Sequence, residues 1–121
     1  MKVGDYVRTK HYGICKIIDI YNEDKIELDK INAFGIKGVC YNAENIIKSR
    51  PNIIDLIEVG DILVIKDFVD DACMIFTDIY LIQNEQQLLN IKNDLEKNKN
   101  KKLYSIVTSE QFSQMEYRIG E

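Results

Sequence analysis

The sequence lacks several features that mark particular classes of protein. Its 121 residues contain no tryptophan, one proline and three cysteines. It has no uninterrupted apolar run of about 18 residues, the length of a membrane-spanning helix, and its first residues form no apolar signal-peptide core. Cys15, Cys40 and Cys73 are widely separated and form no CxxC pair, which is typical of buried thiols in a reducing compartment. We therefore expect a cytoplasmic protein without a membrane segment.

Residues with catalytic or metal-binding chemistry are also scarce. The single histidine, His11, lies in a predicted turn without a nucleophile motif beside it. One histidine and three scattered cysteines do not form the paired ligand spacings of a structural zinc site, and the sequence has neither a P-loop nor a GxGxxG motif. The acidic pairs at 23–24 and 70–71 fall in predicted turns, where aspartate favours the backbone geometry. The sequence therefore predicts a non-enzymatic protein with no catalytic residue, metal or cofactor.

The charge balance and the apolar content indicate which partners the chain can bind and whether it folds. The formal net charge of −4 argues against sequence-independent binding of nucleic acid over the whole surface, because such binding depends on neutralising phosphates. Hydrophobic residues make up 45% of the chain, which is enough to build a core that offsets chain entropy. A chain of this length is typical of one domain, and we expect residues 1–121 to form it.

Alternating residues and short turns predict β-hairpins in the first part of the chain. The first predicted strand has Val3, Val7 and Thr9 on one face, and Tyr6, Arg8 and Lys10 on the other. Gly13 suits the following tight turn, because glycine accepts positive φ. Further strands are predicted at 14–20, 25–29 and 39–41.

One three-residue phrase occurs in both parts of the chain. Val3-Gly4-Asp5 precedes the first predicted hairpin, and Val59-Gly60-Asp61 precedes a second one. Because similar strand patterns follow, we expect two β-meanders built alike, at 1–50 and 58–121, within the single domain. Pro51 marks the best candidate boundary, because proline disfavours helix at the residue before it.

The pattern changes from strands to helix in the second half. A strand is predicted at 61–68, and the segment 72–82 is apolar on both faces, which predicts a central strand or one covered on both sides. From Asn84, a suitable N-cap, the period is about 3.6, and a helix is expected over 84–99. Its apolar stripe is formed by Leu88, Ile91 and Leu95. We interpret the lysines that gather near its C-terminal end, Lys92, Lys97, Lys99, Lys101 and Lys102, as solvated.

The last part of the chain predicts a strand, a helical turn and a closing strand. The strand is expected at 103–107, a helix cap at 108–111 before Phe112 and Met115, and a final strand at 117–119. Together these elements predict an α+β fold. We expect a small, strongly bent antiparallel sheet, SH3-like in its N-terminal half, with one main helix in the C-terminal half.

The segment VGDYVRTKHYGICKIIDI resembles the opening hairpin of small SH3-like and Tudor-like barrels. These barrels include the RNA polymerase-binding domain of the CarD and transcription-repair coupling factor family, in which a Gly-Asp pair begins the first strand and a His-Gly-type turn leads to the second. The matching positions are Gly4, Asp5, Val7, His11, Gly13 and Ile20, with Tyr12 inserted. The resemblance implies an SH3-like partial barrel.

Three segments also resemble small uncharacterised proteins carried by phages and prophages of low-GC Firmicutes. They are MKVGDYVRTK…GICKIIDI, NIIKSRPNIIDLIEVGD and SIVTSEQFSQMEYRIGE. The resemblance implies an accessory protein that acts in the cytoplasm of the bacterial host cell, and many inhibitors of bacterial defence are of this size.

The first functional hypothesis is a non-enzymatic phage protein that binds and inhibits a host protein, such as a CRISPR nuclease or another defence component. An acidic surface can occupy a basic nucleic-acid groove, because charge complementarity speeds association. The candidate residues for such a surface are Asp67, Asp70, Asp71 and Asp78.

Two alternatives have other binding partners. The second hypothesis is an SH3-like module that binds nucleic acid or RNA polymerase through alternating basic and aromatic residues of the first hairpin. These residues are Tyr6, Arg8, Lys10, His11, Tyr12 and Lys16. The third hypothesis is a sponge that captures a nucleotide signal in a pocket at an oligomer interface, and the apolar segment 72–82 leaves room for a homodimer.

Overall fold

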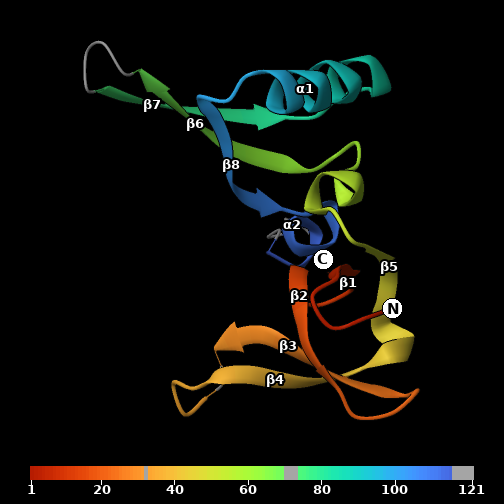
Figure 1. The fold of residues 1–121 in the computed structure, drawn as a ribbon. Coiled ribbons are helices and arrows are strands. Elements are labelled where there is room, and N and C mark those ends of the chain that lie inside the picture. The colour runs from red at the N-terminus through yellow and green to blue at the C-terminus, as the bar shows by residue number, and fades with distance from the viewer. Residues whose placement is uncertain (32, 70–73, 116–121) are drawn as a thin grey trace. The chain divides into compact units, whose positions relative to one another are not determined.

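The computed structural model describes residues 1–31, 33–69 and 74–115. It confirms the expected α+β class, because antiparallel sheets dominate and one main helix lies in the second half of the chain. The chain divides into two compact units, Met1–Leu56 and Ile57–Glu121. Figure 1 shows the strands of the first unit in red to yellow and those of the second in green to blue. No helix in the described ranges combines the length and the hydropathy that crossing a bilayer requires.

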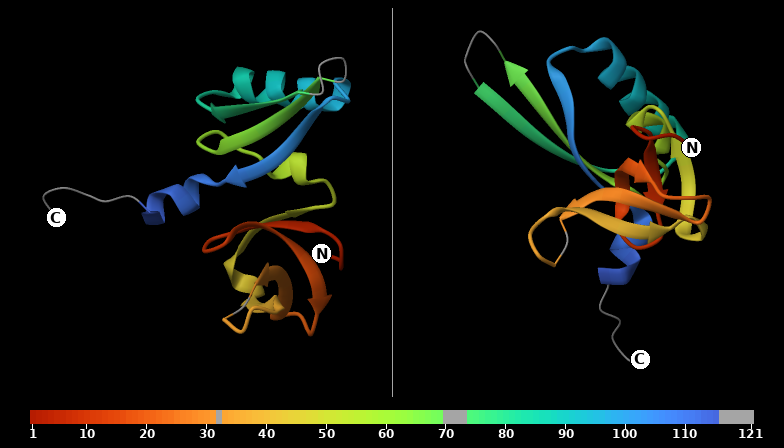
Figure 2. Two further views of the ribbon diagram at one scale, coloured as in Figure 1. Left: turned by 90° about the vertical axis from the view of Figure 1, so that its left-hand side faces the viewer. Right: turned by 60° about the horizontal axis from the view of Figure 1, so that its bottom comes forward.

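The first unit is a five-stranded antiparallel sheet in the spatial order β4-β3-β2-β1-β5. Its strands are β1 (Tyr6–Thr9), β2 (Gly13–Ile20), β3 (Lys25–Ile31), β4 (Lys37–Asn42) and β5 (Ile46–Arg50). The 3₁₀ helix η1 (Ala43–Asn45) follows β4, and η2 (Ile53–Leu56) follows β5. The register shifts within the β1–β5, β2–β3 and β3–β4 pairings, and such irregularities bend a sheet. The resulting curl of β2 and β3 is visible in Figure 2.

The core of the first unit is made by side chains that four strands direct to one side of the curved sheet. They are Val7, Cys15, Ile17, Ile26, Leu28 and Tyr41. Thr9 is buried at the edge of this core, where its hydroxyl donates to the Gly13 carbonyl and accepts from the Tyr12 N–H. Val7 and Thr9, which were expected on one face of the strand, are both buried, whereas Val3 precedes β1 and is exposed.

Arg8, a candidate binding residue of the first hairpin, is buried. Its exposed fraction is 0%, and its Nη1 donates to the Leu56 carbonyl at 3.0 Å. The reason is the position of β1, which lies between β2 and β5 and also contacts η2. The side of β1 opposite the apolar core is thus covered by η2, whose last carbonyl receives the guanidinium.

The repeated phrase folds into the same turn in both units. In the first unit the Gly4 N–H donates to the Ile17 carbonyl, and the Ile17 N–H donates to the Asp5 carbonyl. In the second unit the Gly60 N–H donates to the Ile82 carbonyl, and the Ile82 N–H donates to the Asp61 carbonyl. Both glycines have positive φ, 94° and 97°, which glycine adopts without a steric penalty. In each turn the aspartate carboxylate accepts the N–H three residues before it, from Lys2 and from Glu58. The shared phrase therefore specifies one turn that opens two hairpins.

The second unit contains a three-stranded sheet and two helices. Its strands are β6 (Ile62–Val69), β7 (Met74–Leu81) and β8 (Lys101–Val107), in the order β7-β6-β8. Its helices are α1 (Glu85–Lys97) and α2 (Ser109–Met115). Leu63, Ile65, Ile82 and Leu88 are buried in this unit. The predicted closing strand at 117–119 lies outside the described residues.

Both helices begin as their capping residues predict. The Asn84 side chain accepts the Gln87 N–H at 2.8 Å at the start of α1. Before α2, the Thr108 hydroxyl accepts the Gln111 N–H and the Gln111 side chain accepts the Thr108 N–H, which is a reciprocal capping box. The helix α1 ends two residues earlier than expected, and the N–H of its C-cap, Asn98, donates to the Asp94 carbonyl.

The strand β7 corrects the prediction of a central or doubly covered strand. Among the described residues β7 pairs with β6 alone, so it is an edge strand. Met74, Ile75, Phe76, Ile79 and Leu81 are exposed. The two-sided apolar pattern of this segment is typical of burial within a sheet, but the strand order places β6 at the centre instead.

The cysteines differ in environment, which corrects the expectation that all are buried. Cys15 is buried and Cys40 is exposed, while Cys73 lies outside the described residues. Burial raises the pKa of the Cys15 thiol to about 11. At pH 8 only about a thousandth of Cys15 thiols would then be ionised, and the thiolate is the nucleophile.

We therefore expect iodoacetamide to distinguish the two thiols. In a Cys73→Ser variant at pH 8, Cys40 should be alkylated within minutes, and Cys15 should react only after urea unfolds the chain. Peptide mass spectrometry of samples quenched at successive times measures both reactions. Equal alkylation of Cys15 and Cys40 in the folded protein would show that Cys15 is accessible.

Candidate binding surfaces

The basic and aromatic residues of the first hairpin do not form one continuous surface. Tyr6 of β1 lies opposite Lys16 of β2, whose Nζ is 5.7 Å from the centroid of the Tyr6 ring. The buried Arg8 separates this pair from the β1–β2 turn. Arg8 is therefore not available for a phosphate or for a partner at the surface.

The turn of the same hairpin forms a separate aromatic cluster. Lys10, His11 and Tyr12 are exposed there. The rings of His11 and Tyr12 lie 5.9 and 5.4 Å from the ring of Tyr41, measured between centroids. His11 Nδ1 is 2.8 Å from the Tyr41 hydroxyl, and burial raises the pKa of Tyr41. These contacts give the exposed rings a structural role in holding the turn against β4.

The predicted acidic surface is only partly within the described residues. Asp70 and Asp71 lie outside them. In the pairing of β6 with β7, Ile65 lies opposite Asp78 and Asp67 lies opposite Phe76. Ile65 and Asp67 are two residues apart on β6 and share a face, so Asp67 and Asp78 point to the same side of the sheet. Asp67 is also opposite Lys101 of β8, so part of the negative charge is compensated. We call this side, on which Ile65 and Tyr80 face α1, the helix face.

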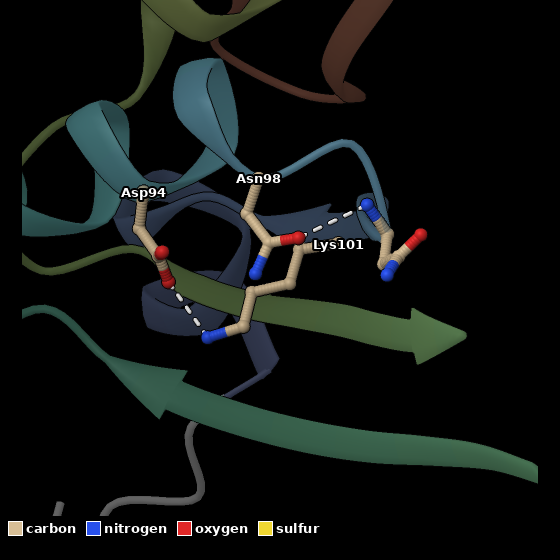
Figure 3. A network of polar contacts seen from close by, with 4 residues as sticks. Asp94, Asn98 and Lys101 are labelled. Atoms are coloured by element: carbon tan, nitrogen blue, oxygen red, sulfur yellow. Dashed lines mark hydrogen bonds and ion pairs between the residues drawn. The ribbon is translucent and has the colours of Figure 1, made fainter. Parts of the chain in front are cut away.

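A cleft of about 790 Å³ lies between α1 and the helix face. Its floor includes Ile65 and Tyr80. The wall on α1 is formed mostly by amide and charged side chains, namely Asn84, Gln86, Gln87, Asn90, Asn93, Asp94 and Lys97. At one end Lys101 Nζ is 2.7 Å from the Asp94 carboxylate, which raises the pKa of Lys101 (Figure 3). The volume is in the range of small-molecule sites, but such sites are lined mostly by apolar side chains, whereas amide and charged side chains predominate here.

The edge strand β7 carries several exposed apolar side chains, and the sequence pointed to this segment only as a possible surface for self-association. Phe76 on the helix face is 49% exposed, and Ile79 on the opposite face is 71% exposed. We call that opposite face the open face. Exposed apolar side chains that gather on one element often mark an interaction site, and free strand edges pair readily with another chain. The apolar pattern of 72–82 on both faces of the predicted strand was the signal available in the sequence.

The described residues contain no group of three histidine, cysteine or acidic side chains arranged to hold a metal ion. Comparison of the chain with protein-family models, curated proteins and solved structures gives no significant match.

Proposed function

We propose that this chain is a non-enzymatic phage or prophage accessory protein that binds a host protein through β7 and inhibits it. A component of bacterial defence, such as a CRISPR nuclease, is the class of target that we propose. The single observation that carries the proposal is the edge strand with apolar side chains exposed on both of its faces.

The chemistry of β7 favours a protein as its partner. Its edge offers backbone N–H and C=O groups that an extended segment of another protein can pair with, and alternate apolar side chains would fill pockets on that partner. Between Met74 and Leu81 the only charged residue is Asp78. Proteins that avoid edge pairing place lysine or proline on such strands, and β7 has neither.

Charge supports the choice of a target that itself binds nucleic acid. Asp78 is exposed on the helix face beside the β7 edge, and the chain as a whole carries a net charge of −4. A basic groove would attract such a surface, and long-range attraction mainly raises the association rate. Inhibition would follow because the bound protein covers the groove.

Affinity capture with and without nuclease tests the proposal. The tagged chain is incubated with a lysate of a low-GC Firmicute, and retained proteins are identified by mass spectrometry. We expect one host protein to be retained in near-stoichiometric amount whether or not the lysate has been digested with nuclease.

Two other outcomes would contradict the proposal and favour its alternatives. Loss of every protein after nuclease digestion would favour the nucleic-acid or RNA polymerase-binding module. A nucleotide released when the captured sample is denatured, without any retained protein, would favour the nucleotide sponge and would direct attention to the cleft beneath α1.

A further inference from the structure

The open face of the second unit carries two lysines directly opposite each other. Lys66 of β6 is registered with Lys102 of β8, and on its other side with Thr77 of β7. Registered residues point to the same side of a sheet. Lys66 Nζ also lies 3.8 Å from the centroid of the Tyr104 ring, so Tyr104 occupies this face as well.

The arrangement of these lysines is electrostatically unfavourable without an anion. Like charges in directly opposed cross-strand positions destabilise a sheet. The described acidic residues of β6 and β7, Asp67 and Asp78, point to the helix face and not to the open face. Lys101, the neighbour of Lys102 in the chain, also points to the helix face, where Asp94 pairs with it. An anion on the open face would offset the repulsion between Lys66 and Lys102.

Aromatic rings and a further lysine adjoin this pair. A pocket of about 300 Å³ is lined by Phe68, Lys99, Asn100 and Lys102. Phe68 follows Lys66 by two residues on β6, so it shares the open face. Tyr104 is 66% exposed. Three lysines, two rings and one amide are therefore gathered at one end of the open face.

We infer that this end of the open face binds single-stranded nucleic acid. The phosphates would contact Lys66, Lys99 and Lys102. Two bases would stack on the rings of Tyr104 and Phe68, and Asn100, which lines the same pocket as Phe68, would hydrogen-bond a base edge.

The geometry favours a single strand over a duplex and over a free nucleotide. Bases in a duplex are stacked on one another and cannot reach an aromatic ring on a sheet surface, whereas the bases of a single strand can. The lysines and rings are spread over β6, β8 and the segment before β8, which suits a chain with several phosphates and bases better than one nucleotide. This surface lies beside the β7 edge and is independent of the protein partner proposed for it.

Fluorescence anisotropy with purified chain and labelled oligo-dT and oligo-U of about eight nucleotides tests the inference. We expect saturable binding that weakens with salt with a slope near −2, because three phosphate contacts each contribute about 0.7. Lys102→Ala should weaken binding about fivefold, and Tyr104→Leu about tenfold. A duplex of the same length should compete poorly.

Lys101→Ala is the matched control, because it removes a lysine adjacent in sequence on the other face of the same strand. We expect it to leave the affinity unchanged, and circular dichroism of each variant establishes that it is folded. The inference is overturned by absence of binding at low salt, by equal losses for Lys101→Ala and Lys102→Ala, or by an unchanged affinity of Tyr104→Leu. None of these results bears on capture of a host protein, which is tested separately.

Discussion

Arg8→Ala should lower the free energy of unfolding by about 3 kcal/mol. The substitution removes a fully buried side chain whose Nη1 donates to the Leu56 carbonyl. It leaves a cavity beside β1 and a buried carbonyl without its donor. Arg8→Met keeps most of the packing of the side-chain stem, so its loss should be smaller. Urea unfolding followed by far-ultraviolet circular dichroism measures both values.

Arg50→Ala provides the matched control for this measurement. Arg50 ends the neighbouring strand β5, is exposed, and donates to the adjacent Ser49 carbonyl. Its truncation should change the free energy of unfolding by no more than about 0.5 kcal/mol. If Arg8→Ala and Arg50→Ala have equal small effects, Arg8 is not an internal anchor between β1 and η2.

Asp61→Ala should also cost about 3 kcal/mol of stability. The buried carboxylate accepts two backbone N–H groups, from Glu58 at 2.9 Å and from Ser109 at 3.0 Å. These bonds join the turn before β6 to the first residue of α2. Alanine removes the carboxylate that accepts these two part-buried N–H groups, whereas Asp61→Asn retains one acceptor oxygen and should recover part of the loss.

Asp5→Ala is the corresponding change in the other copy of the same turn. There the carboxylate accepts the Lys2 N–H, and that hydrogen bond is exposed. Water can replace the lost acceptor, so the expected cost is below about 1 kcal/mol. Similar losses for Asp5→Ala and Asp61→Ala in urea unfolding would mean that burial and the second bond to Ser109 contribute little.

Local sequence patterns were sufficient to predict the elements that depend on nearby residues. Asn84 as an N-cap and the apolar stripe that contains Leu88 predicted α1, and the Asn84 side chain caps that helix in the structure. The cap expected at 108–111 predicted α2, and Thr108 and Gln111 form it by reciprocal hydrogen bonds. The repeated Val-Gly-Asp phrase indicated two hairpins, because its glycine and aspartate specify the turn through local bonds.

Features that depend on distant residues were not predictable in the same way. The sequence makes Arg8 a candidate binding residue because alternation within β1 does not reveal η2, whose carbonyl acceptor lies 48 residues later. β7 appeared central because its composition does not encode the strand order, which places β6 in the middle. The lysines at 99–102 appeared to be a solvated helix end, but β8 begins at Lys101 and sends alternate lysines to opposite faces.

The most direct test of β7 as the docking strand is a comparison of three baits in nuclease-treated lysate. Ile79→Lys places a charge at the most exposed apolar position of β7, and Leu89→Lys makes the same kind of change at an exposed position of α1. We expect Ile79→Lys to reduce the captured host protein by about tenfold or more, with Leu89→Lys equal to the unmodified chain. Equal capture by all three baits would contradict the proposal that the host protein binds β7.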